Sequence, residues 1–203
     1  MPKVVDHDER RREIANAVAR IAVARGVEAI SFREVASEAG ISVALVQHYF
    51  GTKENLLIGT INLQSEAIGQ RMLAELGDLE PDADPLRRIE AIATTFLPVD
   101  DRSTSEMRLY LAFAGAALTN DALRTTEAFR NEGVLRAAVA ELLELAASQH
   151  RVRDDLIPDI EARAIISLVL GLSLAVLLDS TTADEAVGVL KAHLDALSRG
   201  RHG

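Results

Sequence analysis

The chain has 203 residues, of which 48% are hydrophobic, and a net charge of −9 at pH 7. This length suits one large domain or a small domain joined to a larger one, and the apolar content excludes a chain that is disordered throughout. Cysteine is absent, which excludes disulfides and thiolate sites for metal or redox chemistry. Alanine, leucine, arginine and glutamate are the most frequent residues, which favours an all-α protein.

The acidic excess lies in the C-terminal part of the chain. Residues 1–75 carry 9 basic and 10 acidic side chains, a net charge of −1, whereas residues 76–203 carry 13 and 21, a net charge of −8. A negative net charge disfavours nonspecific binding to DNA. Because the first 75 residues are nearly neutral, locally placed cations can still form a nucleic-acid surface there.

The first predicted helix begins near Asp6 or Asp8 and ends at Gly26. One face of this helix is apolar at helical spacing and carries Ile14, Ala17, Val18, Ile21 and Ala22. Three consecutive arginines, Arg10, Arg11 and Arg12, lie near its start. They are either a solvated polar face or a basic arm that lies against DNA, and the residues alone leave both interpretations open.

Residues 31–53 predict two short helices joined by a tight turn and followed by the start of a longer helix. Ser31 and Glu34 have the spacing of a capping box at the start of the second helix. Gly40 ends this helix, and the fourth helix runs to about Leu76. Side chains that can cap the second, third and fourth helices are Ser31, Ser42 and Thr52. The layout is that of a helix-turn-helix, whose second helix enters the major groove of DNA.

The third helix, residues 43–50, has an outward face that suits base recognition. At 100° per residue, Val46 and Phe50 point toward the core and His48 points away from it. The outward groups are uncharged, whereas a solvated helix face is usually charged. The residues expected to read bases are Val43, Ala44, Leu45, Gln47 and His48: Gln pairs with adenine, His donates to guanine, and an apolar group touches the thymine methyl.

A second set of side chains is expected to hold the DNA backbone. Hydroxyl groups, cations and the free N–H groups at helix N-termini bind phosphate oxygens. The residues with these properties around the third helix are Ser31, Arg33, Ser42, Tyr49, Thr52 and Lys53. A structural turn between bundle helices, without DNA, is the alternative interpretation of the same spacing.

Residues 10–60 resemble the TetR family of bacterial transcription regulators. The matching residues are Gly26, Ser31, Val35-Ala36, Ala39-Gly40-Ile41-Ser42, Tyr49-Phe50 and Lys53-Glu54. The triplet His48-Tyr49-Phe50 is similar to the subgroup of the choline-responsive repressor of betaine synthesis. The sequence departs from many members at Ala44, where they have Gly, and at Gln47, where they have a phosphate-binding Tyr, so the operator sequence does not carry over.

The resemblance implies two domains and about nine helices. An N-terminal helix-turn-helix DNA-binding domain would occupy residues 1–52, with the fourth helix, 53–76, connecting it to a C-terminal ligand-binding and dimerisation domain, residues 77–203. The segment GDLEPDADP, residues 77–85, is the strongest boundary signal in the chain because it holds two prolines and four acidic residues. Further helices are predicted at roughly 86–97, 104–118, 122–149, 159–179 and 183–198.

The last two predicted helices suit a dimer interface. The helix at 159–179 is apolar on every side and therefore must be covered on every side, and two such helices from each protomer would form a four-helix interface. The residues expected there are Ile165, Leu168, Leu172, Val176, Val187, Leu190 and Leu194. An ordinary monomeric core is the alternative.

A ligand pocket is the hardest feature to predict. The large adaptable side chains of three neighbouring helices, with one cation among them, are Phe96, Met107, Arg108, Tyr110, Phe113 and Phe129. Such a stripe is also typical of plain core. The chain has too few aromatic residues for a convincing cage around a quaternary ammonium group, so we do not carry choline over as the ligand.

The sequence therefore predicts a ligand-responsive DNA-binding regulator, a repressor that binds a near-palindromic operator as a homodimer and is released by an unknown small molecule. No cofactor, metal site or enzymatic activity is expected, since the five histidines show no ligand spacing and no nucleophile motif is present. The N-terminus shows no export signal, and the longest apolar run, Ala164–Leu178, is shorter than the ~20 residues of a membrane span, which predicts a cytoplasmic protein that does not enter the membrane. A helical protein-interaction module and a helical-bundle enzyme remain the alternatives.

Overall fold

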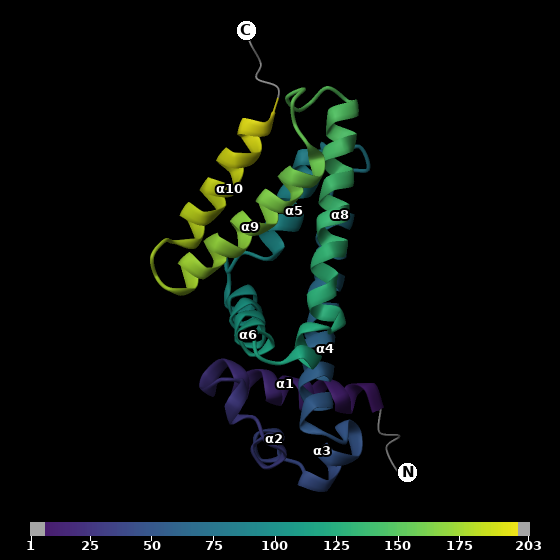
Figure 1. Cartoon of the computed structure of the whole chain (residues 1–203), viewed down its shortest axis with the longest axis vertical. Coiled ribbons are helices and arrows are strands. Elements are labelled where there is room, and N and C mark those ends of the chain that lie inside the picture. The colour runs from purple at the N-terminus through teal and green to yellow at the C-terminus, as the bar shows by residue number, and fades with distance from the viewer. Residues whose placement is uncertain (1–6, 199–203) are drawn as a thin grey trace. The chain divides into compact units, whose positions relative to one another are not determined.

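The computed structural model describes residues 7–198 of the chain (Figure 1), and these residues are helical apart from turns and one isolated antiparallel bridge between Val152 and Ser198. Contacts between residues group them into two compact units. Unit 1 contains the residues up to Ala67 together with Arg108–Arg130, and unit 2 contains Ile68–Met107 together with the residues from Asn131 onward.

Unit 1 begins with three helices and a short 3-10 segment and also takes parts of longer helices. Its elements are α1 (His7–Arg25), η1 (Val27–Ala29), α2 (Phe32–Ala39), α3 (Val43–Phe50), the first part of α4 (Lys53–Gly77), the end of α6 (Asp101–Ala117), α7 (Asp121–Arg124) and the start of α8 (Glu127–Ser148). Unit 2 holds the remaining parts of α4, α6 and α8 together with α5 (Pro85–Thr95), α9 (Pro158–Leu177) and α10 (Ala183–Leu197).

The helix-turn-helix forms where the sequence predicts it, because each helix start has a capping side chain. The hydroxyl groups of Ser31, Ser42 and Thr52 accept from the backbone N–H three residues later at 3.2, 3.2 and 3.1 Å. Gly40 ends α2 in the left-handed region, with φ of 66°, a conformation that favours glycine. The expected capping box at Ser31 is only half formed, since the Glu34 carboxylate pairs with Arg25 at 2.7 Å instead.

The core of unit 1 joins α1–α4 to segments much later in the chain. The predicted inward residues of α3, Val46 and Phe50, are 0% and 8% exposed. They belong to one apolar cluster with the inner face of α1 and with four side chains from α6 and α7: Leu109, Phe113, Ala117 and Leu123. Because protein interiors are packed as densely as organic crystals, the burial of Val46 and Phe50 in this cluster fixes the orientation of α3.

The core of unit 2 is built from α5, α8, α9 and α10. Asp84 caps α5, with Pro85 in its first turn, where a missing N–H costs nothing. The buried Ser173 on α9 donates to the Val169 carbonyl at 2.7 Å and lies 3.1 Å from the Phe96 carbonyl beyond α5. The largest fully buried side chains here are Ile89, Leu97, Leu143, Ile165 and Leu190.

Two features differ from the sequence prediction. The predicted single helix at 122–149 is two helices, α7 and α8, which a turn at Thr125 and Thr126 separates. The two contact units also divide the chain differently from the predicted domains, since Arg108–Arg130 packs with the N-terminal helices. The expected cap Asp6 lies outside the described residues.

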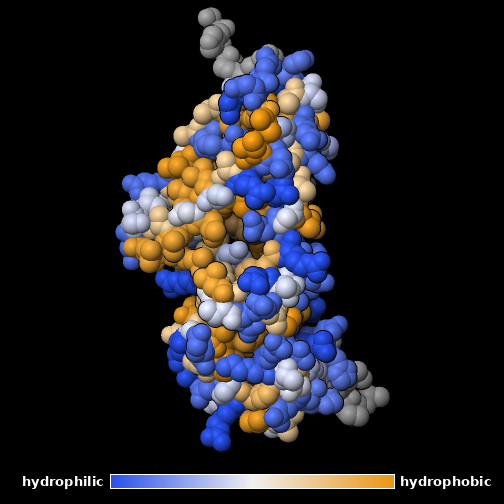
Figure 2. All heavy atoms as spheres, in the orientation of Figure 1, coloured by the Kyte–Doolittle hydropathy of each residue, from blue (hydrophilic) through white to orange (hydrophobic). Residues whose placement is uncertain are grey.

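Among residues 7–198, one helix, α9, is long and apolar enough to cross a membrane, with a mean hydropathy of 2.0 in its most apolar window. This helix is longer than the apolar run from which the prediction was made, because it begins at Pro158. A buried helix of a soluble protein passes the same test, but only 28% of this window is buried inside the chain. In Figure 2, apolar residues gather over α9 and the loop that leads to α10. One face of α9 therefore lacks a cover within a single chain.

Candidate nucleic-acid interface

The outward face of α3 carries the residues expected to read bases. Val43, Ala44, Gln47 and His48 are exposed, and Leu45 is half-buried. Because Val46 and Phe50 anchor the opposite face in the core, these five side chains project from a helix that cannot rotate about its own axis without exposing apolar surface. None of the five is charged, so the face offers amide, imidazole and apolar groups, as base edges require.

Potential phosphate-binding groups flank this helix on both sides. Arg33, in the first turn of α2, is exposed and makes no ion pair with any residue that the structure describes. Lys53, at the start of α4, is also exposed, and its Nζ lies 3.5 Å from the Glu28 carbonyl, which is a weak contact. Both cations can therefore turn toward phosphate with little loss of existing interactions. The hydroxyls of Ser31, Ser42 and Thr52 hold the helix starts in place through the caps described above.

Tyr49 lies on the flank of α3 and contacts the start of α1. Its hydroxyl is 3.1 Å from Nδ1 of His7, and the two rings are 5.7 Å apart at 50°. The neighbouring His48 packs edge-on against the Tyr49 ring at 5.5 Å. His7 is not among the predicted site residues, because no sequence signal links positions 7 and 49.

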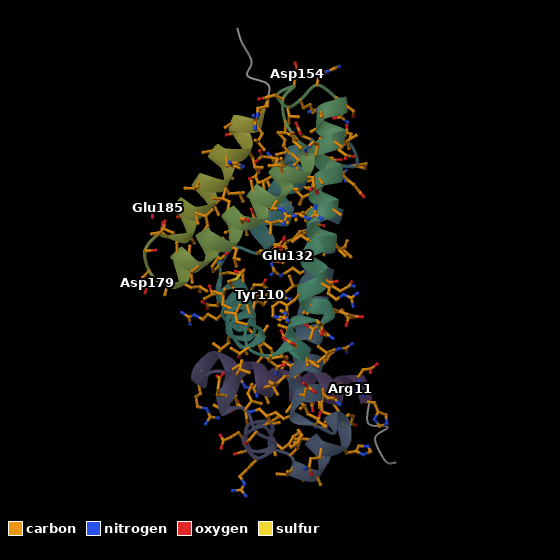
Figure 3. All side chains as sticks on the ribbon, in the orientation of Figure 1. Arg11, Tyr110, Glu132, Asp154, Asp179 and Glu185 are labelled. Carbon is orange, nitrogen blue, oxygen red and sulfur yellow. The ribbon has the colours of Figure 1, made fainter. Side chains whose placement is uncertain are left out.

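The arginines near the start of α1 are only partly available. Arg10 pairs with Glu13 on the same helix, while Arg11 and Arg12 are exposed; Arg11 is labelled on α1 in Figure 3. Further along α1, Arg20 pairs with Glu38 of α2 at 2.5 Å. Two of the three clustered arginines thus remain open to a partner, and the basic-arm interpretation stays a prediction.

Comparison with known proteins agrees with this geometry. Residues 14–59 match the family described as bacterial regulatory proteins, tetR family, and residues 85–199 match the description BetI-type transcriptional repressor, C-terminal. The chain belongs to the TetR family. The predicted resemblance, including the subgroup of the betaine-synthesis repressor, is thereby confirmed, and the chain is a DNA-binding, ligand-responsive transcription regulator.

Named relatives and solved structures of this family cover most of the chain. The HTH-type transcriptional regulator PksA of Bacillus subtilis is 28% identical over 200 residues, 97% of this chain and 94% of the relative. BetI of Rhizobium meliloti is 32% identical over 124 residues, 61% of this chain and 60% of the relative. The crystal structure of a putative regulator from Saccharomonospora viridis in complex with choline is 22% identical and shares the fold, with a TM-score of 0.85 over 96% of this chain and 100% of the other.

The residues predicted to line a ligand pocket belong partly to unit 1 and partly to unit 2. Tyr110 and Phe129 contact each other in unit 1, with ring centroids 5.7 Å apart, and Tyr110 is labelled on α6 in Figure 3. Phe113 is 0% exposed in the core of unit 1 and so borders no space that admits water. This contradicts its assignment to a pocket. Arg108 is exposed, and Phe96 and Met107 belong to unit 2.

The predicted dimer residues also need correction. Ile165, Leu190 and Leu194 are 1%, 0% and 4% exposed within a single chain, so they cannot reach a partner, and the prediction is wrong for them. They form the chain's own core because the largest apolar stripe of each helix packs against α5 and α8. Leu168, Leu172, Val176 and Val187 are half-buried. The large apolar side chains that are exposed on these helices and the adjoining loop are instead Ile160, Leu170, Leu174, Leu178 and Val189.

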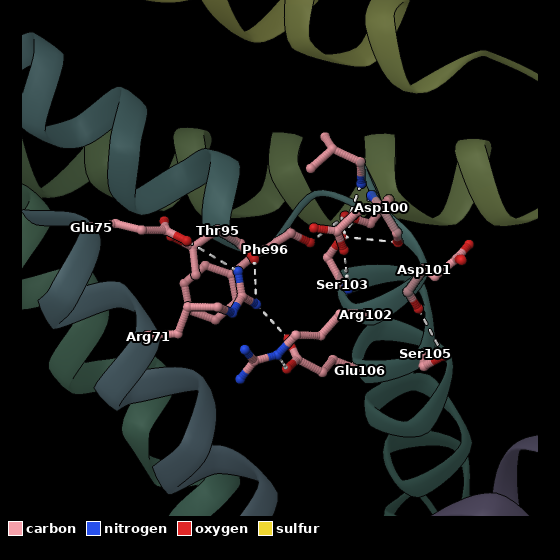
Figure 4. Close-up of polar contacts among 12 residues, drawn as sticks. Arg71, Glu75, Thr95, Phe96, Asp100, Asp101, Arg102, Ser103, Ser105 and Glu106 are labelled. Carbon is pink, nitrogen blue, oxygen red and sulfur yellow. Dashed lines mark hydrogen bonds and ion pairs between the residues drawn. The ribbon is translucent and has the colours of Figure 1, made fainter.

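A polar cluster in unit 2 was not predicted from the sequence. Arg71 on α4 donates to the Thr95 carbonyl at 3.1 Å and pairs with Glu75 and with Glu106 of α6 (Figure 4). Arg102 bonds the second oxygen of Glu106 at 2.9 Å. The Arg71 and Glu106 side chains are only 17% and 13% exposed. The four-residue spacings of Arg71–Glu75 and Arg102–Glu106 are visible in the sequence, whereas Arg71 and Glu106 are 35 positions apart.

The start of α6, next to this cluster, is held by a reciprocal cap. Asp100 accepts from the backbone N–H of Ser103 at 2.6 Å, and the Asp100 N–H donates to the Ser103 hydroxyl at 3.0 Å. The Asp100 carboxyl also accepts from the Ser103 hydroxyl at 2.8 Å. The bonds that it accepts from Ser103, first from the backbone N–H and then from the hydroxyl, lower its pKa below the ordinary value. Among the described residues, no group of three or more His, Asp or Glu could hold a metal ion.

Proposed function

We propose that this regulator binds a near-palindromic operator as a homodimer through α3, and that a small-molecule effector releases it. The observation that carries the proposal is the exposed, uncharged face of α3 between the two available cations, Arg33 and Lys53. In this assignment Val43, Ala44, Leu45, Gln47 and His48 read base edges. The phosphate contacts come from Ser31, Arg33, Ser42, Tyr49, Thr52 and Lys53.

The chemistry of the two groups of residues differs. Gln47 can form paired hydrogen bonds with an adenine, which distinguish it from other bases. Lys53 binds any phosphate and displaces a counterion, so its contribution falls with salt and is independent of sequence. The Ala44 methyl group, which many family members lack, narrows the space between α3 and the groove floor and adds an apolar contact.

The exposed stripe on α9 and α10 is the proposed dimer surface. Leu170, Leu174 and Leu178 lie along one side of α9 and the residue that follows it, and Val189 lies on α10. Ser167, Gly171 and Ala192 lie exposed beside them, and their small side chains allow close helix approach. Such a surface is self-complementary in a two-fold dimer, and covering it accounts for the uncovered face of α9 without a membrane. A cytoplasmic location is part of this proposal.

Leu174→Asp tests the dimer surface, with Leu145→Asp, at an equally exposed leucine (45%) on α8, as the matched control. We expect the first variant to sediment as a monomer and to lose operator binding, because a charge at the centre of an apolar interface is left without a partner. The control should remain a dimer. A dimer of unchanged affinity in Leu174→Asp would contradict this location of the interface.

The effector acts by favouring a conformation whose recognition helices no longer fit the two half-sites. A shift from 99:1 to 1:99 between the two conformations needs roughly 5.5 kcal/mol of differential affinity. Choline is bound by the Saccharomonospora viridis regulator, but a quaternary ammonium ion is held best between several aromatic faces. Tyr110 and Phe129 are two neighbouring rings in unit 1, and Phe96 belongs to unit 2. We therefore leave the effector open.

DNA binding by purified variants tests the interface. Gln47→Ala should cost about 1–3 kcal/mol and blur the preference at one base pair, whereas Lys53→Ala should weaken all sequences alike and flatten the salt slope by about 1. Gln149→Ala removes the same amide, and Arg87→Ala removes a cation, from exposed positions outside the helix-turn-helix, and both controls should change neither quantity. A wild-type affinity in both test variants would overturn the assignment.

A gel shift with the DNA that flanks the protein's own coding region provides a first operator. Binding to this DNA in preference to random sequence supports the regulator. A helical protein-interaction module, the alternative use of the Leu45–Tyr49 face, would show no such preference.

A further inference from the structure

The contact between His7 and Tyr49 joins the start of α1 to the end of the recognition helix. The two residues are 42 positions apart, and the hydroxyl of Tyr49 lies within hydrogen-bond distance of Nδ1 of His7, at 3.1 Å. The imidazole is exposed, whereas the Tyr49 ring is half-buried and packs against the core of unit 1. The ring is therefore fixed by the fold, and the direction of its hydroxyl proton is open to control by a neighbour.

We propose that His7 is a positioning residue for DNA binding, which donates from Nδ1 to the Tyr49 oxygen and so directs the Tyr49 hydroxyl proton toward a phosphate. The inference rests on the proposed function of Tyr49 as a phosphate contact. It assigns to His7 a role through Tyr49 and not a contact of its own with DNA.

The direction of the hydrogen bond follows from the inventory of protons. A phosphate offers only acceptors, and the phenol has a single proton. If Nδ1 accepts that proton, Tyr49 presents only lone pairs to the phosphate, and the contact is repulsive. If Nδ1 carries a proton and donates it, the phenol proton is free for the phosphate, and a charge-assisted hydrogen bond results. A productive contact by Tyr49 therefore requires His7 in the form with a proton on Nδ1.

The surroundings hold this pair in register. His48 packs edge-on against the other part of the Tyr49 ring, so the ring has a histidine neighbour on each helix. The first turn of α1 fixes the backbone of His7. Two rings held by two helices lose less conformational freedom on binding DNA than a free surface side chain would, which is the usual benefit of pre-organisation.

A double-mutant cycle separates positioning from direct contact. The probe is a duplex that the wild-type protein selects from random-sequence DNA, and affinity is measured by fluorescence anisotropy at about pH 8, where an ordinary histidine is neutral. Tyr49→Phe and His7→Ala should each weaken binding about fivefold to tenfold, as expected for one charge-assisted hydrogen bond. His7→Ala should have no further effect in the Tyr49→Phe background, because its partner is already absent.

Two additional measurements exclude a general structural effect. His7→Asn places an amide where Nδ1 lies, so it can donate to Tyr49 and should restore affinity to within about twofold of wild type. The slope of log K against log salt should stay unchanged in the His7 and Tyr49 variants, since neither side chain is proposed to bring a cation to a phosphate, while Lys53→Ala lowers it by about 1. Unfolding temperatures should match, because His7 is at the surface.

The outcomes distinguish this inference from the function on which it rests. If His7→Ala weakens binding equally with Tyr49 and with Phe at position 49, or if it lowers the salt slope, His7 contacts DNA directly and the positioning role is overturned. If Tyr49→Phe has no effect while Gln47→Ala and Lys53→Ala do, the interface stands and the phosphate contact of Tyr49 is wrong, together with the inference. If none of these variants changes affinity, the proposed interface itself fails.

Discussion

Gly59, in the first half of α4, has no side chain and therefore leaves room for the ring of Phe50 at the end of the recognition helix α3. A Cβ atom at this position would lie 2.8 Å from Cε1 and 3.3 Å from Cδ1 of Phe50, the residue that anchors the end of α3 in the core. The first distance is shorter than real contacts allow, so in Gly59→Ala the Phe50 ring must move. Phe50 is 8% exposed and has little room to do so.

Two terms of opposite sign decide the stability of Gly59→Ala. Alanine in a helix interior is favoured over glycine by about 1 kcal/mol, whereas overpacking a core typically costs about 1–3 kcal/mol. The same substitution at Gly69, later in α4, meets nothing within 4 Å, so only the favourable term applies there. We therefore expect Gly59→Ala to be less stable than Gly69→Ala by about 1–3 kcal/mol. At about 2–4 °C per kcal/mol for a chain of this size, this difference is roughly 2–12 °C in Tm.

Calorimetry of both variants at one protein concentration measures this difference, and anisotropy with the selected operator measures its consequence for DNA binding. A shifted Phe50 displaces the outward face of α3, so Gly59→Ala should also bind its operator more weakly, while Gly69→Ala should bind as wild type does. An unfolding temperature for Gly59→Ala as high as that of Gly69→Ala, with full operator affinity, would refute the reasoning.

Four further substitutions test the packing and the helix caps of unit 2 by thermal unfolding. Arg71→Met leaves the largely buried Glu106 with one partner fewer and should lower the free energy of unfolding by about 2 kcal/mol. Arg71→Met combined with Glu106→Gln should cost less than the sum of the two single changes, because the two side chains interact with each other. Additive losses would contradict this coupling. Thr182→Ala removes the capping box of α10 and should cost about 1 kcal/mol; no loss would show that α10 is held by its core face alone. The lowered pKa of Asp100 contributes stability that is present above the ordinary carboxyl value of 3.8 and is lost as the pH falls through the folded-state pKa. The difference in the free energy of unfolding between wild type and Asp100→Ala should therefore become smaller below about pH 4. A difference that does not change with pH would exclude the carboxylate as its origin.

The helix-turn-helix could be predicted almost completely because its signals are local. The caps at Ser31, Ser42 and Thr52 each bond a backbone N–H three residues away, and Gly40 ends α2 by its own conformation. The inward and outward faces of α3 follow from the 3.6-residue period once Val46 and Phe50 are assigned to the core. All of these interactions lie within a few residues of one another, so the order of residues contains them. The family resemblance was visible for the same reason.

The sequence could not decide which residues of α9 stay exposed, because α9 is apolar all round. When apolar residues surround a helix on every side, the sequence pattern does not show which face packs against the chain's own core. The strongest stripe, with Ile165 on α9 and Leu190 and Leu194 on α10, packs inside the chain. The weaker one, with Leu174, stays exposed. The pocket prediction failed at Phe113 for a related reason, since a large apolar side chain suits a core and a binding site equally well.

The sequence by itself determined the helix-turn-helix, the caps of its helices and the inward and outward faces of α3, because these depend on hydrogen bonds and periodicity within single helices. Only the tertiary structure decided which apolar face of α9 and α10 remains exposed, that Arg71 pairs with Glu106, and that His7 meets Tyr49. Arg71 and Glu106 are 35 positions apart, and His7 and Tyr49 are 42 positions apart. The formation of these contacts depends on how whole helices pack, and local patterns carry no information about that choice.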